Sequence, residues 1–261
     1  MNNITASMLW PDIAPQWMLN APEWLEDFFF NLYKCFVFKE RYMLFVNGLG
    51  NTLLLTFFAL MIGIVLGVVV SLVRVTWDKN HTEMSGLPKL LLRIANMISR
   101  VYLTIIRGTP VVVQILLLNF VVFAASRNKI LVGCLCFGIN SGAYVAEIFR
   151  GGIQSIDAGQ MEAGRSLGFG YIPTMRHIIL PQAFKNVLPP LGNEFIVLLK
   201  ETAVVGYIGL SDLTYAASTV GGATYEYLFP LLLAAVIYLI LVIFLTYLVE
   251  KLERRLRTGE R

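Results

Sequence analysis

Two long apolar runs without a charged residue constrain this chain more than any other feature. Residues 53–73 and residues 227–249 form runs of 21 and 23 amino acids that contain no Asp, Glu, Lys or Arg. A helix of about 20 apolar residues crosses the hydrocarbon core of a bilayer. Only 15% of the 261 residues are charged, whereas a soluble domain usually carries about a quarter. The chain is therefore predicted to be an integral membrane protein, not a soluble enzyme with buried core helices.

The predicted fold is an all-α, polytopic membrane protein with about five transmembrane helices. Backbone polar groups cannot remain unpaired in lipid, so long apolar runs are expected to be helical. The five helices are expected near residues 42–74, 92–125, 130–149, 180–199 and 227–249. Residues 42–261 would then form one transmembrane domain.

The first 41 residues form a separate segment that is rich in aromatic side chains. Trp10, Trp17 and Trp24 occur in this segment, and Trp is enriched where a membrane meets water. An interfacial helix is predicted near residues 22–38. We expect this segment to lie outside the cytoplasm.

Basic residues predict how the chain is oriented in the membrane. Residues 201–226 contain no Lys or Arg, whereas two connections and the C-terminal tail are basic. These basic residues are Lys79, Lys89 and Arg93 in the first connection, Arg165 and Arg176 in the third, and Lys251, Arg254, Arg255, Arg257 and Arg261 in the tail. Cytoplasmic loops carry the excess of Lys and Arg, so the C-terminus is predicted to be cytoplasmic and the N-terminus outside. Arg127 and Lys129 in the second connection oppose this assignment weakly.

The composition argues against several classes of function. The basic pI of about 9.0 is explained by membrane orientation, so no nucleic-acid partner is predicted. Three cysteines are too few for a disulfide framework, and the Cys134 and Cys136 pair lacks further metal ligands, so no metal site is predicted. A phosphate-binding G-x-x-x-x-G-K-[ST] loop is absent from the sequence. We therefore expect neither an enzyme nor a cofactor bound by this chain.

The third connection has the pattern of a short capped helix. Asp157 suits the N-cap, and Gly168 suits a left-handed C-terminal cap. Glu162, Ala163 and Arg165 between them favour helix, while small residues such as Gly164 leave a surface that a partner can approach closely. From spacing alone, a docking helix and an ordinary connecting helix are both compatible with this pattern.

The same connection resembles the EAA motif of ATP-binding-cassette importer permeases. Residues 162–164 read Glu-Ala-Gly, Gly168 follows after three intervening residues, and residues 178–181 read Ile-Ile-Leu-Pro after nine more. The one departure from the motif is Gly164 in place of the second Ala. The resemblance implies that Asp157, Glu162, Ala163, Gly164, Arg165 and Gly168 belong to a cytoplasmic coupling helix that sits in a cleft of a separate ATPase.

Further motifs resemble the polar amino acid branch of that family, from about residue 42 to the C-terminus. They are Asn-Gly and Asn-Thr-Leu at residues 47–48 and 51–53, Arg-Gly-Thr-Pro at 107–110, the run at 142–153, and Pro-Pro-Leu-Gly-Asn-Glu-Phe at 189–195. The resemblance implies a permease that imports polar amino acids by alternating access across a prokaryotic plasma membrane. Its implied partners are an ATPase dimer that binds ATP and Mg²⁺, an identical or homologous second permease, an extracytoplasmic substrate-binding protein and membrane lipid.

Charged and polar residues at membrane depth are candidates for contacting the substrate. Glu194 and Glu201 could pair with a cationic group, which favours basic amino acids slightly; the alternative for Glu201 is an ion pair with Lys200 or Arg107. The other candidates along the pathway are Asn140, Gln114, Arg107, Asn51 and Thr52. For each of these, a contact that packs helices or anchors the chain at an interface is the alternative interpretation.

Two other kinds of function are compatible with a small apolar membrane protein. A self-sufficient channel or carrier would have no use for a docking motif. A membrane scaffold would leave the interrupted helix at Pro110 and the charges at membrane depth unexplained. The sequence also predicts close helix packing at Gly63 and Gly67, and a supporting ion pair between Glu147 and Arg150.

Overall fold

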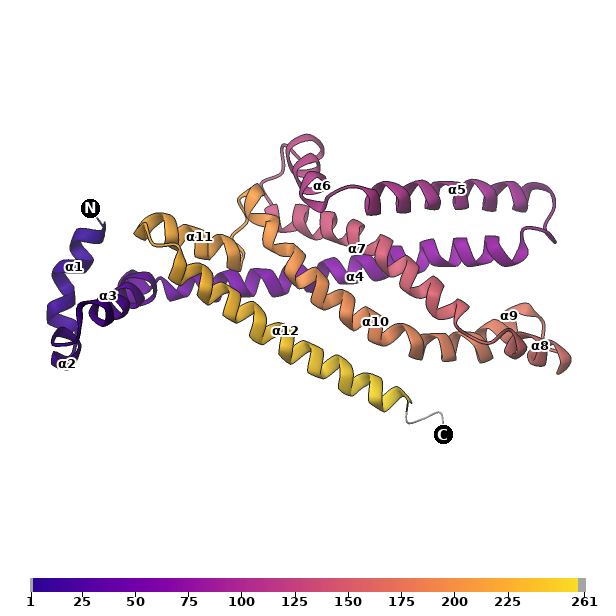
Figure 1. The fold of residues 1–261 in the computed structure, drawn as a ribbon. Coiled ribbons are helices and arrows are strands. Elements are labelled where there is room, and N and C mark those ends of the chain that lie inside the picture. The colour runs from indigo at the N-terminus through magenta and orange to yellow at the C-terminus, as the bar shows by residue number, and fades with distance from the viewer. Residues whose placement is uncertain (1, 258–261) are drawn as a thin grey trace. The chain divides into compact units, whose positions relative to one another are not determined.

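The computed structural model describes residues 2–257, and this part of the chain is helical without any β-strand (Figure 1). Its α-helices are α1 (Asn2–Ile13), α2 (Gln16–Leu19), α3 (Glu23–Leu32), α4 (Tyr42–Asn80), α5 (Gly86–Gly108), α6 (Val111–Leu117), α7 (Lys129–Gln154), α8 (Ala158–Ser166), α9 (Tyr171–Thr174), α10 (Leu180–Glu201), α11 (Leu213–Thr224) and α12 (Leu228–Arg257). Short π or 3-10 segments lie at η1 (Tyr33–Val37), η2 (Phe38–Glu40), η3 (Leu118–Val122), η4 (Met175–Ile179) and η5 (Thr202–Ile208). The all-α prediction is confirmed.

The chain divides into two compact units, each with its own apolar core. The first unit comprises Met1–Leu54 and Thr202–Val242, and the second comprises Leu55–Glu201 and Ile243–Arg261. Phe45 and Leu213 lie in the core of the first unit. The second unit contains α5 to α10, and thus the whole connection that resembles the EAA motif.

Three helices in the described chain are long and apolar enough to cross a membrane, namely α4, α7 and the Leu228–Leu256 part of α12. The pair formed by α5 and the α6–η3 segment passes the same test together and would give a fourth span. The remaining predicted span, over residues 180–199, is occupied by the helix α10. Its Pro189, Pro190 and Glu194 make it less apolar than the others. The chain is thus a multi-pass membrane protein with three or four strongly apolar helices.

The second predicted helix, over residues 92–125, is wrong as one continuous element. It breaks at Thr109 and Pro110, and the helices on either side are bent by 108°. Pro110 has no N–H to donate, and the residue before a proline is driven to extended backbone. Thr109 accordingly has φ −124° and ψ 145°.

The two outer predicted helices are longer than expected. α4 continues to Asn80 and α12 to Arg257, since a helix backbone does not need apolar side chains to extend beyond a bilayer. α12 therefore includes Lys251, Arg254 and Arg255 of the basic tail, while Arg261 lies outside the described residues.

Glycines allow α4 and α7 to approach closely within the second unit. A Cβ added to Gly67 would lie 2.5 Å from Val145 Cγ1, and Gly63 also faces α7. On the opposite helix, a Cβ added to Gly138 would lie 2.6 Å from Ile62 Cγ2. The predicted packing role of Gly63 and Gly67 is confirmed, because either helix would have to move away if these residues were larger.

The N-terminal segment contains the helix predicted near residues 22–38, as α3 followed by η1. Trp10 packs edge-on against Phe30 with ring centroids 5.6 Å apart. Trp17 and Trp24 are instead 59% and 70% exposed. Exposed aromatic rings favour the membrane–water interface, and the location of this segment at that interface stays a prediction.

Candidate functional site

The connection between α7 and α10 begins with a capped helix, α8. Oδ1 of Asp157 accepts a hydrogen bond from the Gly159 N–H at 2.6 Å, which satisfies a free donor at the start of α8. Gly168 follows the helix with a φ of +85°, in the left-handed region that favours glycine. Its N–H donates to the Arg165 carbonyl at 2.9 Å. The predicted caps at Asp157 and Gly168 are both confirmed.

The inner face of this connection is fastened to the rest of the second unit. Met161 packs against an apolar cluster built from α4, α7, η4 and α10. Burial raises the pKa of Tyr171 at the start of α9, and a hydrogen bond with Asn80 at the end of α4 opposes that rise. The connection is therefore attached at α8 and again at α9, and movement of the membrane helices would carry it along.

Gly164 is the one buried member of the Glu162-Ala163-Gly164 triplet. A Cβ at this position would lie 2.5 Å from Cγ2 of Thr174. Thr174 is itself fully buried and donates a hydrogen bond to the Gly170 carbonyl at 2.9 Å. Thr174 thus explains why glycine stands at position 164 where the motif has its second Ala, because an alanine side chain would collide with this threonine.

The outer face of the same connection is exposed and partly apolar. Glu162, Ala163 and Arg165 are exposed on α8. The large apolar side chains that follow are also exposed: Leu167 by 76%, Phe169 by 46% and Ile172 by 74%. Clustered apolar side chains beside charged ones are typical of a surface that contacts another protein.

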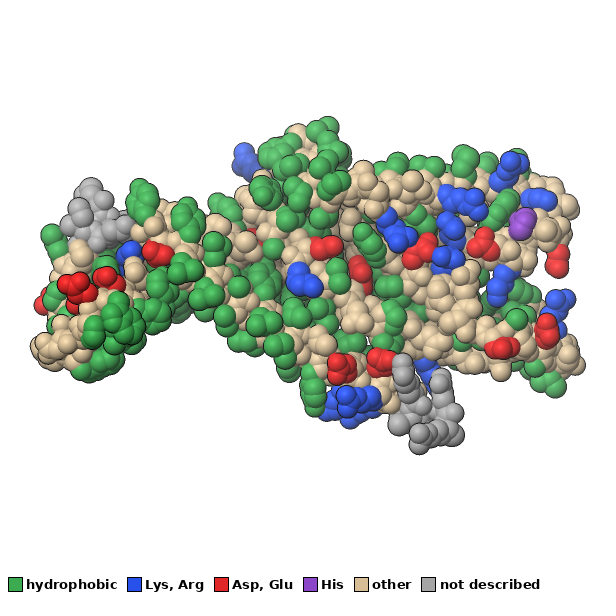
Figure 2. Space-filling model, in the orientation of Figure 1, with side chains coloured by type: hydrophobic (Ala, Val, Ile, Leu, Met, Phe, Trp, Pro, Cys, Tyr) green, Lys and Arg blue, Asp and Glu red, His purple; other side chains and the backbone are tan. Residues whose placement is uncertain are grey.

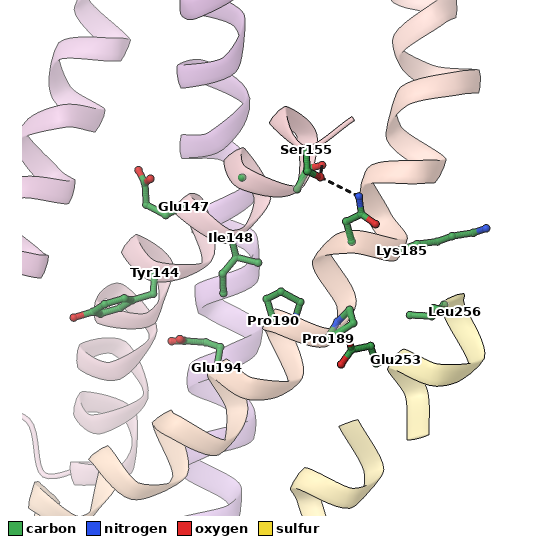
Figure 3. A pocket seen from close by; sticks show the side chains of 13 residues that line it. Tyr144, Glu147, Ile148, Ser155, Lys185, Pro189, Pro190, Glu194, Glu253 and Leu256 are labelled. Carbon is green, nitrogen blue, oxygen red and sulfur yellow. Dashed lines mark hydrogen bonds between the residues drawn. The ribbon is translucent and has the colours of Figure 1, made fainter. Parts of the chain in front are cut away.

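A cavity of about 830 Å³ opens between α7, α10 and the end of α12 (Figure 3). Three acidic side chains and one basic side chain line it, namely Glu147, Glu194, Glu253 and Lys185. All of these residues belong to the second unit. The lining is therefore acidic and suits a guest that carries a positive charge.

Glu194 and Glu147 are held in different ways at this cavity. Glu194 is only 9% exposed, and Oγ of Ser141 donates to its Oε1 at 2.7 Å. Figure 3 shows the Glu194 side chain directed from α10 toward α7. Glu147 instead pairs with Arg150 through Nη2 at 2.6 Å, so the predicted ion pair is confirmed. No Lys or Arg of residues 2–257 forms an ion pair with Glu194.

Two adjacent prolines open the backbone of α10 beside the cavity. Pro189 and Pro190 have no N–H, so the carbonyls of Lys185 and Asn186 lose their usual helical donors. All four residues line the cavity, and Asn186 also donates to Oγ of Ser155 at 2.9 Å (Figure 3). Sequence reasoning missed Lys185 and Asn186 as site residues. The signal was present in the paired prolines within a membrane helix.

The break after α5 is closed by Gln114. Its Nε2 donates to the Ile106 carbonyl at 2.9 Å and lies 3.1 Å from the Thr109 carbonyl, both near the break at Pro110. Its Oε1 accepts from Nδ2 of the buried Asn140 at 3.0 Å. The structure thus brings together two predicted pathway residues, Gln114 and Asn140, in bonds that hold the bent helix against α7.

Arg107 lies on the other side of that break. Its guanidinium lies 5.5 Å from the ring centroid of Tyr144, which also lines the acidic cavity. Glu201 lies half-buried at the end of α10. Within the described chain it forms no ion pair with Lys200 or Arg107, the two partners considered from the sequence.

Asn51 and Thr52 form bonds within the first unit. Nδ2 of Asn51 donates to the Ser211 carbonyl at 2.7 Å, and the Leu213 N–H donates to Oγ1 of Thr52 at 3.2 Å. A Cβ at the nearby Gly48 would lie 2.7 Å from the Asp212 carbonyl oxygen. These contacts attach α4 to the turn before α11, which is the packing alternative for Asn51 and Thr52.

Comparison with known proteins identifies the kind of chain to which these features belong. Residues 84–258 match the family described as binding-protein-dependent transport system inner membrane component. The chain is 37% identical over 218 residues to the arginine transport system permease protein ArtQ of Bacillus subtilis (strain 168), with 82% of this chain and 93% of that protein covered. It is 35% identical over 222 residues to the putative glutamine transport system permease protein GlnP of Rickettsia bellii (strain RML369-C), with 84% and 95% covered.

A solved structure gives the same result for the fold. A crystal structure of an amino acid ATP-binding-cassette transporter with histidines superposes with a TM-score of 0.72 at 41% sequence identity. The match covers 82% of this chain and 94% of that chain.

Proposed function

The chain belongs to the family of binding-protein-dependent transport system inner membrane components and is the permease subunit of a polar amino acid importer, and on this premise we propose how it performs that transport. Its substrates are amino acids with a positively charged side chain. They pass the acidic cavity between α7 and α10, while ATP hydrolysis by a separate subunit drives alternating access. Glu194 is the observation that supports this substrate class, because its buried carboxylate has a hydroxyl donor but no ion-pair partner among residues 2–257.

The coupling helix in this proposal is α8 with the residues around it. Glu162, Ala163 and Arg165, together with the exposed Leu167, Phe169 and Ile172, dock into a cleft of the ATPase subunit. Asp157 and Gly168 fix the ends of α8, and Gly164 fixes its distance from α9. ATP and Mg²⁺ are bound by the partner ATPase and not by this chain.

The proposed assembly contains two ATPase subunits, two permeases and one extracytoplasmic binding protein in a prokaryotic plasma membrane. The second permease is an identical or homologous copy. The first and third connections and the C-terminus face the cytoplasm, which places the N-terminus outside if α10 counts as the fifth span. Residues 42–261 act as the transmembrane domain and residues 1–41 lie at the outer interface.

ATP hydrolysis by the reconstituted complex tests the substrate class. The chain is purified with its ATPase and binding protein in liposomes, and amino acids are added one at a time. We expect lysine, arginine or histidine to raise turnover only when the binding protein is present. Stimulation by neutral amino acids alone would overturn the cationic class. If no ATPase co-purifies, the chain works as a self-sufficient carrier and the coupling proposal fails.

The charge reversal Glu162→Lys tests the docking surface. Glu162 is exposed, so the variant should fold and insert normally. We expect it to lower both uptake and binding-protein-stimulated ATP hydrolysis, because the charge would meet the wrong partner in the ATPase cleft. Arg93→Glu, a charge reversal at another exposed position, is the matched control. Unchanged stimulation in the Glu162 variant would contradict the assignment of α8.

A further inference from the structure

A second pocket, of about 550 Å³, lies between α4, α5 and α7 and is strongly basic. Its polar lining residues are Arg74, Arg100, Arg107, Thr104 and Glu147. We call it the arginine pocket. Figure 2 shows Lys and Arg side chains over α5 and the end of α4, with Asp and Glu side chains between them.

Three arginines face a single acid in the lining of the arginine pocket, so basic charge is in excess there. That acid, Glu147, attracts Arg74 and Arg107 electrostatically but forms its ion pair with Arg150 at 2.6 Å, and neither ion pair of the described chain involves Arg74, Arg100 or Arg107. Arg74 Nε is buried without a hydrogen-bond partner among residues 2–257. A buried donor that remains unpaired is costly, so an anion at this site would remove the cost.

The level of the arginine pocket along the helices indicates where that anion comes from. Residues 42–73 of α4 carry no charge before Arg74, and residues 130–146 of α7 carry none before Glu147. Arg100 and Arg107 lie seven residues apart on α5, which places them on one face about 10 Å apart along the axis. The pocket therefore lies at the edge of the apolar band, where lipid phosphates are found.

Apolar side chains flank this position on the outside of α5. Met97, Ile98, Val101 and Ile105 are exposed by 61%, 61%, 52% and 55%. Acyl chains could cover these side chains while the headgroup reaches the guanidinium groups. The planar guanidinium binds phosphate oxygens in a bidentate manner, which an ammonium group cannot do.

We propose that the arginine pocket binds the phosphate headgroup of an anionic membrane phospholipid. The inference goes beyond the transport reaction and does not depend on which amino acid is carried. In the proposed orientation the lipid belongs to the cytoplasmic leaflet, where basic pockets between membrane helices recognise anionic headgroups.

Lipid binding to the intact transporter tests this proposal. Binding of phosphatidylglycerol and phosphatidylcholine to the detergent-purified complex is measured by native mass spectrometry and by the thermal shift that each lipid causes. We expect phosphatidylglycerol to bind more tightly than phosphatidylcholine. Each arginine is expected to contribute about a fivefold factor, so Arg100→Gln weakens phosphatidylglycerol about fivefold and the Arg74→Gln, Arg100→Gln double variant about twenty-five-fold.

Matched controls and competing anions make the outcome decisive. Lys79→Gln and Arg93→Gln remove basic residues from the same two helices outside the arginine pocket, and should leave lipid affinity unchanged. Because Arg100 is exposed, its single variant tests the site even if the double variant does not fold. Equal weakening in the controls would overturn the proposal. A thermal shift produced by inorganic phosphate or by the transported amino acid, and lost in Arg100→Gln, would also overturn it by assigning the pocket to a soluble anion.

Discussion

Replacing Gly164 by alanine changes the packing of α8 in a way that can be calculated. The new Cβ would lie 2.5 Å from Thr174 Cγ2, whereas carbon atoms in contact are about 3.5–4.0 Å apart. One of the two segments must therefore move by about 1 Å. Overpacking of this kind costs about 1–3 kcal/mol, and the better helix propensity of alanine returns at most about 1 kcal/mol. The net expectation is a loss of about 1–2 kcal/mol in local stability.

A second substitution should restore the lost stability. Thr174→Ala removes both Cγ2 and Oγ1, which would lie 2.5 Å and 2.9 Å from the new Cβ, and with them the hydroxyl that donates to the Gly170 carbonyl. Alone, this change leaves a small cavity and costs about 1 kcal/mol. Together with Gly164→Ala, the alanine methyl occupies the vacated space, so the two changes should compensate instead of adding.

Hydrogen exchange of the α8 amides in the assembled transporter measures this compensation directly. A loss of one to two kcal/mol in local stability speeds exchange about five- to thirtyfold. We expect that acceleration in Gly164→Ala and near-normal exchange in the double variant, with stimulated ATP hydrolysis following the same order. Additive effects of the two substitutions would refute the packing explanation for Gly164.

Two further substitutions test the helix contacts described above. Glu194→Gln should reduce uptake of cationic amino acids about ten- to hundredfold and affect neutral substrates less. This factor corresponds to the roughly 1.5–3 kcal/mol of a hydrogen bond to a charged group. Equal losses for both classes would show that Glu194 is not part of the substrate site. Gly67→Leu should separate α4 from α7 at Val145 and cost at least about 1–3 kcal/mol of stability, measured through the melting temperature and yield of the purified complex. Gly50→Leu is the control, because no described atom lies within 4 Å of its added Cβ. Equal behaviour of the two variants would contradict the close packing.

Local chemistry explains which parts of the fold could be predicted from the sequence. Helix type and the caps at Asp157 and Gly168 depend on neighbours a few residues away or on apolar composition, and the four-residue spacing of Gly63 and Gly67 indicates close helix packing without naming the partner helix. Pro110 predicts an interruption after α5, but neither the 108° bend there nor the hydrogen bond by which Gln114 spans the break has a local signal. No periodicity in the sequence predicts the hydrogen bond between Gln114 and the Ile106 carbonyl.

The candidate site was harder to predict because its residues come from separate helices. Glu194 could be singled out as a charge within an apolar run, but its partner Ser141 lies 53 residues earlier in an unremarkable position. Asn51 and Thr52 resembled pathway residues by polarity alone, whereas their hydrogen bonds reach residues 211–213 about 160 positions away. Polarity indicates that a side chain needs a partner, and only the tertiary structure tells whether that partner is protein or substrate.

The division of α8 into a buried Gly164 and an exposed Glu162 has a consequence for how the transporter can evolve. A change at Gly164 meets Thr174 of the same chain, so a second mutation in the same gene can compensate for it. Glu162 is exposed on α8 and faces the ATPase under this proposal, so compensation for a change there has to arise in the gene for the ATPase. Neighbouring positions of one short helix would then evolve under separate constraints, and an ATPase exchanged between related transporters would be accepted or rejected by the outer residues alone.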